Sequence, residues 1–414
     1  MNNEHLPVGW IEKPLGKLVT FQKGKKTETS DTWQTGYLRY LGASGLQGLE
    51  DGYAATSGAV LAGAKDLLML WDGERSGLVG CGQVGVVAST VAKMAPNDDI
   101  LPEYLYYFLD LHFAWIQARR TGTGVPHVPK DLGRILSVRY PSDKDRQKKV
   151  VDILQSIDMI IHNTQKQINK LSVTKQGMMA DLFSRGIDPA SGKLRPSVHD
   201  APELYIDSIL GPIPCGWNVN RFDLIAEVID PNPSHRYPDS IKFGGVPIAS
   251  TENFDGDDEF ELSKCKHISE AEFHKQLERC NYQCDDVIFA RKGRIGFARK
   301  YGMAKKAFSH TLVVMKAKAG IEPSYLLWLV RSEQFLSSID FEMNSNSGVP
   351  TLGIDVIKRI PSPMPSEAEQ GLIARVLDQL NELLSKEKKT LRQLHLKKAG
   401  LMRDLLTGKV PVSV

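Results

Sequence analysis

The segment KQGMMADLFSRG, residues 175–186, occurs a second time as KKAGLMRDLLTG, residues 397–408. Self-similarity at a fixed spacing is typical of modules that stack or pair. The sequence therefore predicts a chain that contains two copies of one module. The segments share four identities at a single offset of 223 residues: Gly177 and Gly400, Met179 and Met402, Asp181 and Asp404, and Leu182 and Leu405.

Further landmarks extend the repeat over nearly the whole chain, in the same order in both halves. The offset grows from 207 residues at the first landmark to 224 at the third. The second copy therefore contains roughly 17 additional residues, which we expect in loops. The landmarks are LPVGW and IPCGW (from Leu6 and Ile213), PEYL and PSYL (from Pro102 and Pro323), GVP twice (from Gly124 and Gly348), and PS twice (from Pro141 and Pro365).

Both copies contain a heptad seam, because apolar residues recur at alternating spacings of four and three. Two polar residues interrupt each seam, Thr164 and Lys175 in the first and the equivalent Glu387 and Lys398 in the second. Polar residues at seam positions often fix register and partner at some cost in stability. The seams comprise Val150, Leu154, Ile157, Ile161, Ile168, Leu171, Met178 and Leu182, and Ile373, Leu377, Leu380, Leu384, Leu391, Leu394, Leu401 and Leu405.

Each seam predicts one helix of about 40 residues, which would span on the order of 60 Å. We expect Ser142 and Ser366 to cap the free amides at the helix starts, and Gly186 and Gly408 to end the helices. Matched seams in one chain favour pairing of the helices with each other over a stalk that pairs with another chain. An antiparallel pair would place the two globular blocks at opposite ends, and a parallel pair would bring them together.

Composition is that of a globular chain: 414 residues are 42% hydrophobic and 24% charged, enough for two or three cores. The net charge is only +3, so any basic surface must be local. No apolar run approaches the roughly 18 residues of a membrane span, and MNNEHLPVGW does not resemble a signal peptide, so we expect a cytoplasmic protein without a membrane partner. Five cysteines, an odd number, argue against a disulfide framework.

Between the landmarks, the two globular blocks differ almost completely in sequence. Short apolar stretches such as 84–88 and 286–290 predict strands, and 103–119 and 323–338 predict helices, so mixed α/β blocks are expected. A shared scaffold with unmatched interiors suggests two related recognition domains, although drift after an old duplication would leave the same pattern. The predicted division is 1–142 and 205–365 for the two domains, 143–186 and 366–408 for the long helices, 187–204 for a linker and 409–414 for a tail.

The duplicated order of Pro-x-Gly-Trp, variable block, Gly-Val-Pro, heptad helix and Gly-Leu-Met-x-Asp-Leu-Leu-Thr-Gly resembles the specificity subunit of type I restriction-modification systems. The resemblance implies two target recognition domains that each read half of a bipartite, asymmetric site in double-stranded DNA. It also implies that two long antiparallel helices set the spacing between half-sites, with a pseudo-twofold relation between the copies. Two methyltransferase subunits, which use S-adenosylmethionine to modify adenine N6, and restriction-translocase subunits would dock on this scaffold.

Residues for DNA contact are expected among the arginines, lysines and asparagines of the two blocks. Lysine and arginine neutralise phosphates, whereas arginine and asparagine can pair bidentately with guanine and adenine. The base-reading candidates are Arg75, Arg291, Arg294, Asn344 and Asn346, although a solvated surface residue is the more common explanation for any one of them. The full candidate set adds Lys23, Lys25, Lys26, Arg119, Arg120, Lys292, Arg299 and Lys300.

Signatures of catalysis are missing from the sequence. There is no glycine-rich cofactor loop after a strand, no Asn/Asp-Pro-Pro-aromatic tetrad and no Walker-type loop, so we expect a subunit that catalyses nothing and holds no cofactor of its own. Cys265, His267, Cys280 and Cys284 are zinc-ligand types, but their spacing matches no standard knuckle, which favours ordinary thiols and no metal. A coiled-coil adaptor that binds only proteins is the alternative to a DNA-specificity subunit.

Overall fold

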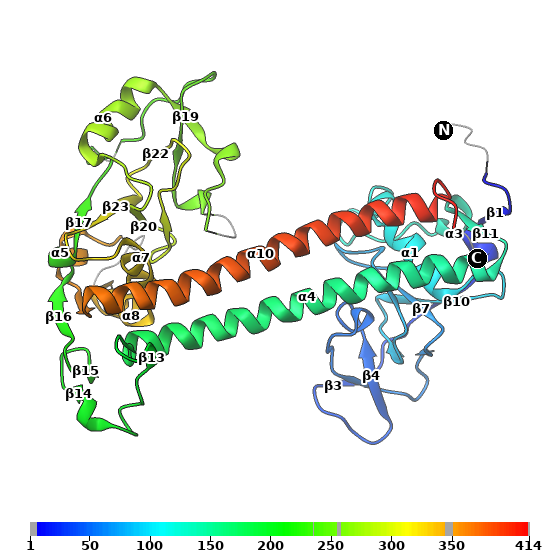
Figure 1. Cartoon of the computed structure of the whole chain (residues 1–414). Helices are drawn as coiled ribbons and strands as arrows, with labels where there is room; N and C mark the ends of the chain where they lie inside the picture. The colour runs from blue at the N-terminus through cyan, green and yellow to red at the C-terminus, as the bar shows by residue number, and fades with distance from the viewer. Residues whose placement is uncertain (1–5, 235, 255–257, 344–350, 413–414) are drawn as a thin grey trace. The chain divides into compact units, whose positions relative to one another are not determined.

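The computed structural model describes residues 6–234, 236–254, 258–343 and 351–412. The chain forms two compact units. Unit 1 comprises Met1–Gln165 with Lys389–Val414, and unit 2 comprises Lys166–Lys388. Each unit therefore combines one globular block with half of each long helix, α4 (Lys144–Ser184) and α10 (Glu367–Leu406), both labelled in Figure 1.

The two long helices run antiparallel. In unit 1, Lys398 of α10 contacts Asp158 of α4, and in unit 2, Lys175 of α4 contacts Asn381 of α10. All sixteen seam residues are buried or half-buried, as the heptad spacing predicts. The expected pair of long antiparallel helices is thus present.

The helix ends follow local sequence signals with one exception. Ser366 accepts a hydrogen bond from the amide of Glu369 (3.4 Å) and caps α10 as predicted. Ser142 instead donates its hydroxyl to the carbonyl of Gly9, and the Asp143 side chain accepts from the amide of Asp145 (2.9 Å) at the start of α4. The prediction of a Ser142 cap was therefore wrong, because the Ser142 hydroxyl bonds to the carbonyl of Gly9 and not to the first amides of the helix.

The main sheet of unit 1 is antiparallel, in the order β2-β10-β7-β8, and packs against α1 to form a core with the start of α4. A second sheet has the order β3-β5-β4-β9-β6, and β1 pairs with β11. The bounds are β1 (Trp10–Pro14), β2 (Val19–Lys23), β3 (Thr29–Ser30), β4 (Tyr37–Leu41), β5 (Tyr53–Ala55), β6 (Leu61–Ala62), β7 (Leu67–Leu70), β8 (Val79–Cys81), β9 (Gly85–Val87), β10 (Val91–Pro96), α1 (Pro102–Leu111), α2 (Phe113–Gln117), α3 (Leu132–Ile135) and β11 (Ser137–Pro141).

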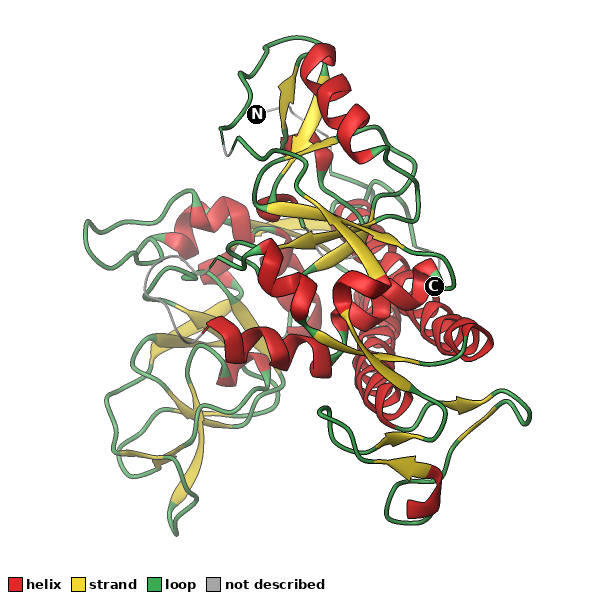
Figure 2. Ribbon diagram, turned by 90° about the vertical axis from the view of Figure 1, so that its left-hand side faces the viewer, coloured by secondary structure: helices red, strands yellow, loops and turns green. Residues whose placement is uncertain are grey.

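Unit 2, whose strands and helices are also drawn in Figure 2, repeats the main sheet in the equivalent order β17-β23-β20-β21. A smaller sheet, β19-β18-β22, carries helix α6, and β16 pairs with β24 as β1 pairs with β11. The bounds are β12 (Ile187–Asp188), β13 (Lys193–Leu194), β14 (Tyr205–Ile206), β15 (Ile213–Pro214), β16 (Asn218–Arg221), α5 (Phe222–Ile225), β17 (Ala226–Ile229), β18 (Val246–Ala249), β19 (Lys266–Ile268), α6 (Glu270–Cys280), β20 (Val287–Ala290), β21 (Ala298–Lys300), β22 (Ala307–Phe308), β23 (Leu312–Ala317), α7 (Pro323–Arg331), α8 (Glu333–Met343), α9 (Ile354–Arg359) and β24 (Pro361–Met364).

The helix that follows the main sheet is broken in both units, where the sequence predicted one continuous helix. The break falls at His112 between α1 and α2, and at Ser332 between α7 and α8. Ser332 has extended backbone angles, and its hydroxyl accepts from the amide of Phe335 to begin the next helix. Apolar periodicity continues across such a break, so it could not be read from the pattern.

Each globular block is joined to its long helix by a buried glutamine. Gln147 donates to the carbonyls of Asp99 (3.1 Å) and Pro141 (2.9 Å) and accepts from the amide of Leu101 (2.8 Å). Gln370, 223 residues later, makes the equivalent bonds to Gly320 (3.2 Å), Pro365 (3.0 Å) and Glu322 (3.0 Å). The duplication thus preserves the hydrogen bonds that hold each globular block against its long helix, α4 or α10.

Candidate nucleic-acid interface

Three segments of unit 1 meet at the end of strand β2. Lys23 pairs with Asp72 (Nζ–Oδ2 2.7 Å), and the other oxygen of Asp72 contacts His127 (Nδ1–Oδ1 2.7 Å). The amide of Gly73 donates to the carbonyl of Pro126 (2.8 Å). Asp72 therefore ties the end of β2, the β7–β8 turn and the loop of residues 121–127 into one edge.

The basic residues predicted for DNA contact in unit 1 gather around this edge. Arg120 donates to the carbonyl of Glu74 (2.6 Å), which places it beside Arg75. Arg119 is exposed and lies over the ring of Trp115 (3.8 Å). We call Lys23, the turn with Arg75, and the Arg119–Arg120 pair the unit 1 edge. The structure thus brings together residues that are nearly 100 positions apart in the sequence.

Lys25, Lys26 and Arg75 are exposed, and in the part of unit 1 that the structure describes none of the three forms an ion pair. Lys25 and Lys26 follow β2 directly, two and three residues beyond Lys23. Their charges are therefore available to phosphate groups. Arg75 occupies the turn between β7 and β8 with its side chain exposed.

The equivalent edge of unit 2 keeps the ion pair but exchanges the charges. Asp230, immediately after β17, pairs with Arg291 at the end of β20 (2.9 Å). The isolated β-bridge between the backbones of Lys292 and Thr351 corresponds to the one between Asp72 and His127 in unit 1. In unit 1 the base lies on β2 and the acid follows β7, whereas in unit 2 the acid follows β17 and the base follows β20.

The predicted contacts of unit 2 divide into surface and interior residues. Arg294 is exposed at the turn after β20, and Lys292 beside it is half-buried. Arg291 is only 4% exposed and also donates to the carbonyl of His310 (3.0 Å), and Arg299 is 8% exposed with Asp258 at 3.7 Å. Arg291 and Arg299 stabilise the fold in this arrangement, and we omit them from the proposed contact set because their guanidiniums are sequestered.

The remaining candidates of unit 2 lie elsewhere. Lys300 on β21 donates to Asp285 (3.1 Å) and Ser324 (2.8 Å), away from the turn that carries Arg294. Asn344 and Asn346 lie outside the described residues. The organising acids Asp72 and Asp230 were missed from the sequence. Asp72 opens the segment Asp-Gly-Glu-Arg, a turn signal directly before Arg75, which could have pointed to it.

The two lysines that interrupt the seams, Lys398 and Lys175, lie where the long helices meet the globular blocks. In unit 1, Lys398 pairs with Asp158 (2.7 Å), which also accepts the hydroxyl of Tyr107 (2.6 Å). In unit 2, the equivalent Lys175 donates to Asn381 (2.7 Å) and lies over the ring of Trp328 (4.9 Å). Burial, assisted by the nearby charge of Arg331, lowers the pKa of Lys175 to about 8.

A family model described as type I restriction modification DNA specificity domain matches residues 7–172 and 216–395, one segment in each copy of the repeat. The chain belongs to this family. It is 26% identical over 427 residues to the type I restriction enzyme MjaVIII specificity subunit of Methanocaldococcus jannaschii, covering 100% of this chain and 95% of that protein. Membership identifies a DNA sequence-specificity component of a restriction-modification system.

Solved structures of type I systems share the fold of this family member. The S subunit of the type I restriction-modification system from M. genitalium has a TM-score of 0.63 at 15% identity, covering 100% of this chain and 98% of that one. A chain from a study of complex assembly and conformational transition in a type I system has a TM-score of 0.55 at 15% identity, covering 98% and 100%. The duplicated mixed α/β architecture is therefore that of type I specificity proteins.

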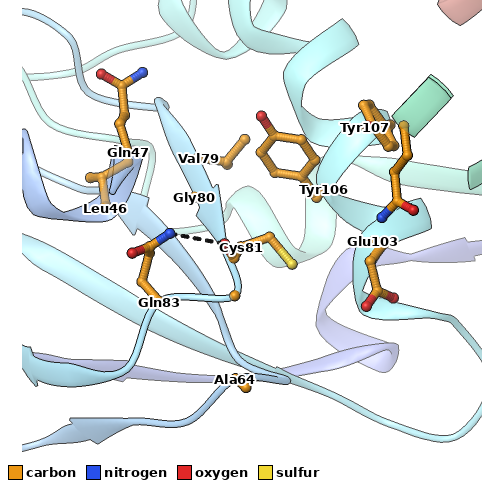
Figure 3. Close-up of a pocket in the computed structure, with 12 residues that line it drawn as sticks. Leu46, Gln47, Ala64, Val79, Gly80, Cys81, Gln83, Glu103, Tyr106 and Tyr107 are labelled. Atoms are coloured by element: carbon orange, nitrogen blue, oxygen red, sulfur yellow. Dashed lines mark hydrogen bonds between the residues drawn. The ribbon is translucent and has the colours of Figure 1, made fainter. Parts of the chain in front are cut away.

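A hollow in unit 1 lies between β8 and α1 and has a mixed polar and apolar lining (Figure 3). Gln47, Gln83 and Gln155 provide amides, and Glu103 provides a carboxylate. Burial raises the pKa of the Cys81 thiol to about 11, so this sulfur is not a thiolate near neutral pH. The lining can hydrogen-bond a polar group but presents no activated nucleophile.

The cysteine and histidine cluster of unit 2 does not converge. Cys280 is buried, whereas Cys284 is exposed and its sulfur lies 3.3 Å from that of Met303. Burial raises the pKa of both Cys265 and Cys280 to about 11. Among the residues that the structure describes, no group of three or more histidine, cysteine or acidic residues is placed to hold a metal ion. In the same described ranges, every helix is too short or too polar to span a membrane.

Proposed function

We propose that unit 1 and unit 2 each read one half of a bipartite, asymmetric site in double-stranded DNA. The supporting observation is the repeated edge at the end of β2 and of β17, where an ion pair braces a turn that exposes Arg75 in one unit and Arg294 in the other. The scaffold around the two edges is duplicated, but the charges and side chains on them differ. Two equivalent edges with different side chains suit two different half-sites.

The antiparallel helices α4 and α10 set the length of the unread spacer in this proposal, and their outer faces carry two methyltransferase subunits. A restriction-translocase subunit joins the full complex, which acts in the cytoplasm. The chain itself catalyses nothing and holds no cofactor, since S-adenosylmethionine belongs to the methyltransferase subunits. The duplication supports two methyltransferase subunits, because equivalent surfaces recur on both copies of the helix.

Selection from a random DNA library tests the proposal. The chain is assembled with its methyltransferase subunits, and bound DNA is sequenced. We expect two short defined sequences separated by a fixed number of undefined base pairs, with affinity that falls steeply as salt rises because phosphate contacts release counterions. Selection of a continuous motif would refute the bipartite site, and selection of no motif would refute DNA reading in favour of a protein-binding adaptor.

Insertion of seven residues into both α4 and α10 tests the role of the helices separately. Seven residues preserve the heptad register, so both seams stay closed while each helix lengthens by about 10 Å. The expected result is a longer spacer between unchanged half-sites. New half-sites with the original spacer would contradict this division of labour.

A further inference from the structure

Two loops at equivalent places carry an exposed aromatic side chain. Residues 24–36, which include the short strand β3, lie between β2 and β4, and the described residues 230–234 and 236–245 lie between β17 and β18. Trp33 in the first loop is 64% exposed, and Phe243 in the second is 91% exposed. Neither ring contacts another aromatic ring within the described parts of the two units. Each ring therefore offers apolar area whose burial against a ligand would stabilise a complex.

Local hydrogen bonds of Ser30 and Gln34 shape the first loop around Trp33. The hydroxyl of Ser30 donates to the carbonyl of Thr32 (2.8 Å), and the Gln34 side chain donates back to Ser30 (3.1 Å). The loop then enters β4 through Gly36, whose φ of 83° is left-handed. These local bonds close a small turn with Trp33 inside its span.

The second loop is fixed by backbone features on both sides of Phe243. Ile241 is anchored by a hydrogen bond from its amide to the carbonyl of His267 (2.8 Å). Gly244 and Gly245 follow Phe243 with φ of 69° and 77° and lead directly into β18. Both units therefore place an exposed ring ahead of a left-handed glycine that leads into a strand of the second sheet, β4 in unit 1 and β18 in unit 2.

Both loops start at the proposed DNA-reading edges. The first leaves β2 at Lys23, which pairs with Asp72, and the second starts at Asp230, which pairs with Arg291. Exposed basic residues occur in both loops, Lys25 and Lys26 in the first and Arg236 and Lys242 in the second, together with the exposed acids Glu28, Asp31 and Asp239. An exposed ring and cations in one loop fit a nucleic acid, because bases stack on aromatic faces while phosphates attract the positive charges.

We propose that Trp33 and Phe243 insert against the bases of the half-site that their own unit reads, and that each acts as an apolar wedge which locally unstacks a base step. This rests on the proposed function, since it requires that each unit bind one half-site. Apart from this ring and its glycine, the two loops differ in length and sequence. The repeated ring is thus a common DNA-distorting element beside side chains that differ between half-sites.

The test uses the complex with the methyltransferase subunits and DNA that carries 2-aminopurine at successive positions of each half-site. With the unaltered chain, we expect fluorescence to rise at one position in each half besides the adenine that the methyltransferase subunit extrudes, because unstacking relieves quenching of this base. Trp33→Ala should abolish the rise in the half-site of unit 1 alone, and Phe243→Ala in that of unit 2 alone. Each alanine variant should bind about tenfold to a hundredfold more weakly, as expected for a lost base stack.

Conservative and control variants distinguish stacking from a general loss of structure. Trp33→Phe and Phe243→Tyr keep a ring and should retain the fluorescence rise. Leu49→Ala and Met303→Ala remove side chains that are 61% and 89% exposed outside these loops, and they should bind as the unaltered chain does.

Unchanged fluorescence and affinity in both alanine variants would overturn the wedge proposal while leaving the proposed function intact. Loss of assembly with the methyltransferase subunits, rather than of the DNA signal, would also overturn it and assign the rings to a protein interface. If the unaltered complex selects no split motif at all, the proposed function fails first.

Discussion

The two seam lysines occupy equivalent positions but have different partners. Lys398 in unit 1 meets a carboxylate, Asp158, whereas Lys175 in unit 2 meets the neutral amide of Asn381. In unit 2 an acid is linked to Lys175 only through Asn381, whose amide donates to Asp258. Asp258 also pairs with Arg331 (2.6 Å). The same polar position is thus satisfied by a direct ion pair in one copy and by a longer network in the other.

The buried glutamines behave in the opposite way, since Gln147 and Gln370 make the same three bonds to backbone atoms. Partners on the backbone are unaffected by changes of side chain. A side chain that bonds only to backbone can therefore keep its role while the surrounding sequence diverges, whereas a side chain that depends on another side chain cannot.

The largest expected effect comes from Gln147→Leu and Gln370→Leu. Each change strands two carbonyl oxygens and one amide inside the protein, so each should lower the free energy of unfolding by about 3 to 5 kcal/mol. Urea unfolding with hydrogen exchange resolved by unit measures the loss. Gln176→Leu, on an exposed face of α4, is the control and should have little effect. Clearly unequal losses of unfolding free energy in the two units would show that Gln147 and Gln370 do not have equivalent roles.

Alanine at the helix-ending glycines should have the next largest effect. Gly186 and Gly408 have φ of 64° and 72°, and an added Cβ would come within 2.6 Å of Trp217 and 2.9 Å of Trp10. Left-handed alanine costs about 1 kcal/mol, and the clash should raise the loss to about 2 to 3 kcal/mol.

Gly192→Ala is the matched control, because Gly192 has φ of 67° but open space around its Cβ position. It should show the backbone penalty alone in thermal unfolding. If Gly408→Ala lowered the stability no more than Gly192→Ala does, the segment that contains Pro7 and Trp10 would move easily to accommodate the new side chain.

Methionine at the seam lysines should separate the units most clearly. Lys398→Met leaves Asp158 without its cation and should destabilise unit 1 by about 1 kcal/mol. Lys175→Met removes a partly desolvated charge that lacks a direct acid partner, so unit 2 should be unchanged or slightly more stable. Destabilisation of unit 2 as large as that of unit 1 would show that the Asn381 network supports a charge as well as Asp158 does.

The pH dependence of unfolding gives a second measure of the same contrast. The pKa of Lys175 is lowered to about 8 from its ordinary value of 10.5, so between these values the unfolded chain binds more protons than the folded one. Stability therefore rises with pH across this window. Lys175→Met should remove that contribution, and identical pH slopes for the two proteins would contradict it.

The smallest effect is expected from single lysines on the two loops. Lys26→Ala and Lys242→Ala should each weaken DNA binding a few-fold, irrespective of sequence, and reduce the slope of log affinity against log salt by about one. Lys305→Ala is the control, since Lys305 already pairs with Glu270 (2.5 Å) outside these loops. A change in sequence preference, in place of a uniform loss, would indicate base contact by these lysines.

Much of the scaffold could be predicted from the sequence because its signals are local. Heptad spacing depends on neighbours three and four residues away, so the sixteen seam residues and both long helices follow from the pattern. The breaks at His112 and Ser332, and the Asp143 cap in place of Ser142, escaped prediction because competing long-range contacts decide them.

The candidate interface was predictable only in part. Arg75 and Arg291 both stand at glycine-rich turns and look alike in the sequence, yet one is exposed and the other is buried. The difference arises because Asp230, 61 residues before Arg291, reaches its guanidinium, whereas Asp72 takes Lys23 and leaves Arg75 in solvent. No local pattern contains that information.

The sequence by itself determined that the chain holds two copies of one module, that each copy ends in a long seamed helix, and that the blocks between them differ. These follow from repetition and periodicity, which are properties of the linear chain. Only the tertiary structure decided which charges face solvent, how each seam lysine is satisfied, and that Trp33 and Phe243 stand at matching places. Those depend on pairings between distant segments, and the free energy of a charge or a ring depends on what the fold packs against it.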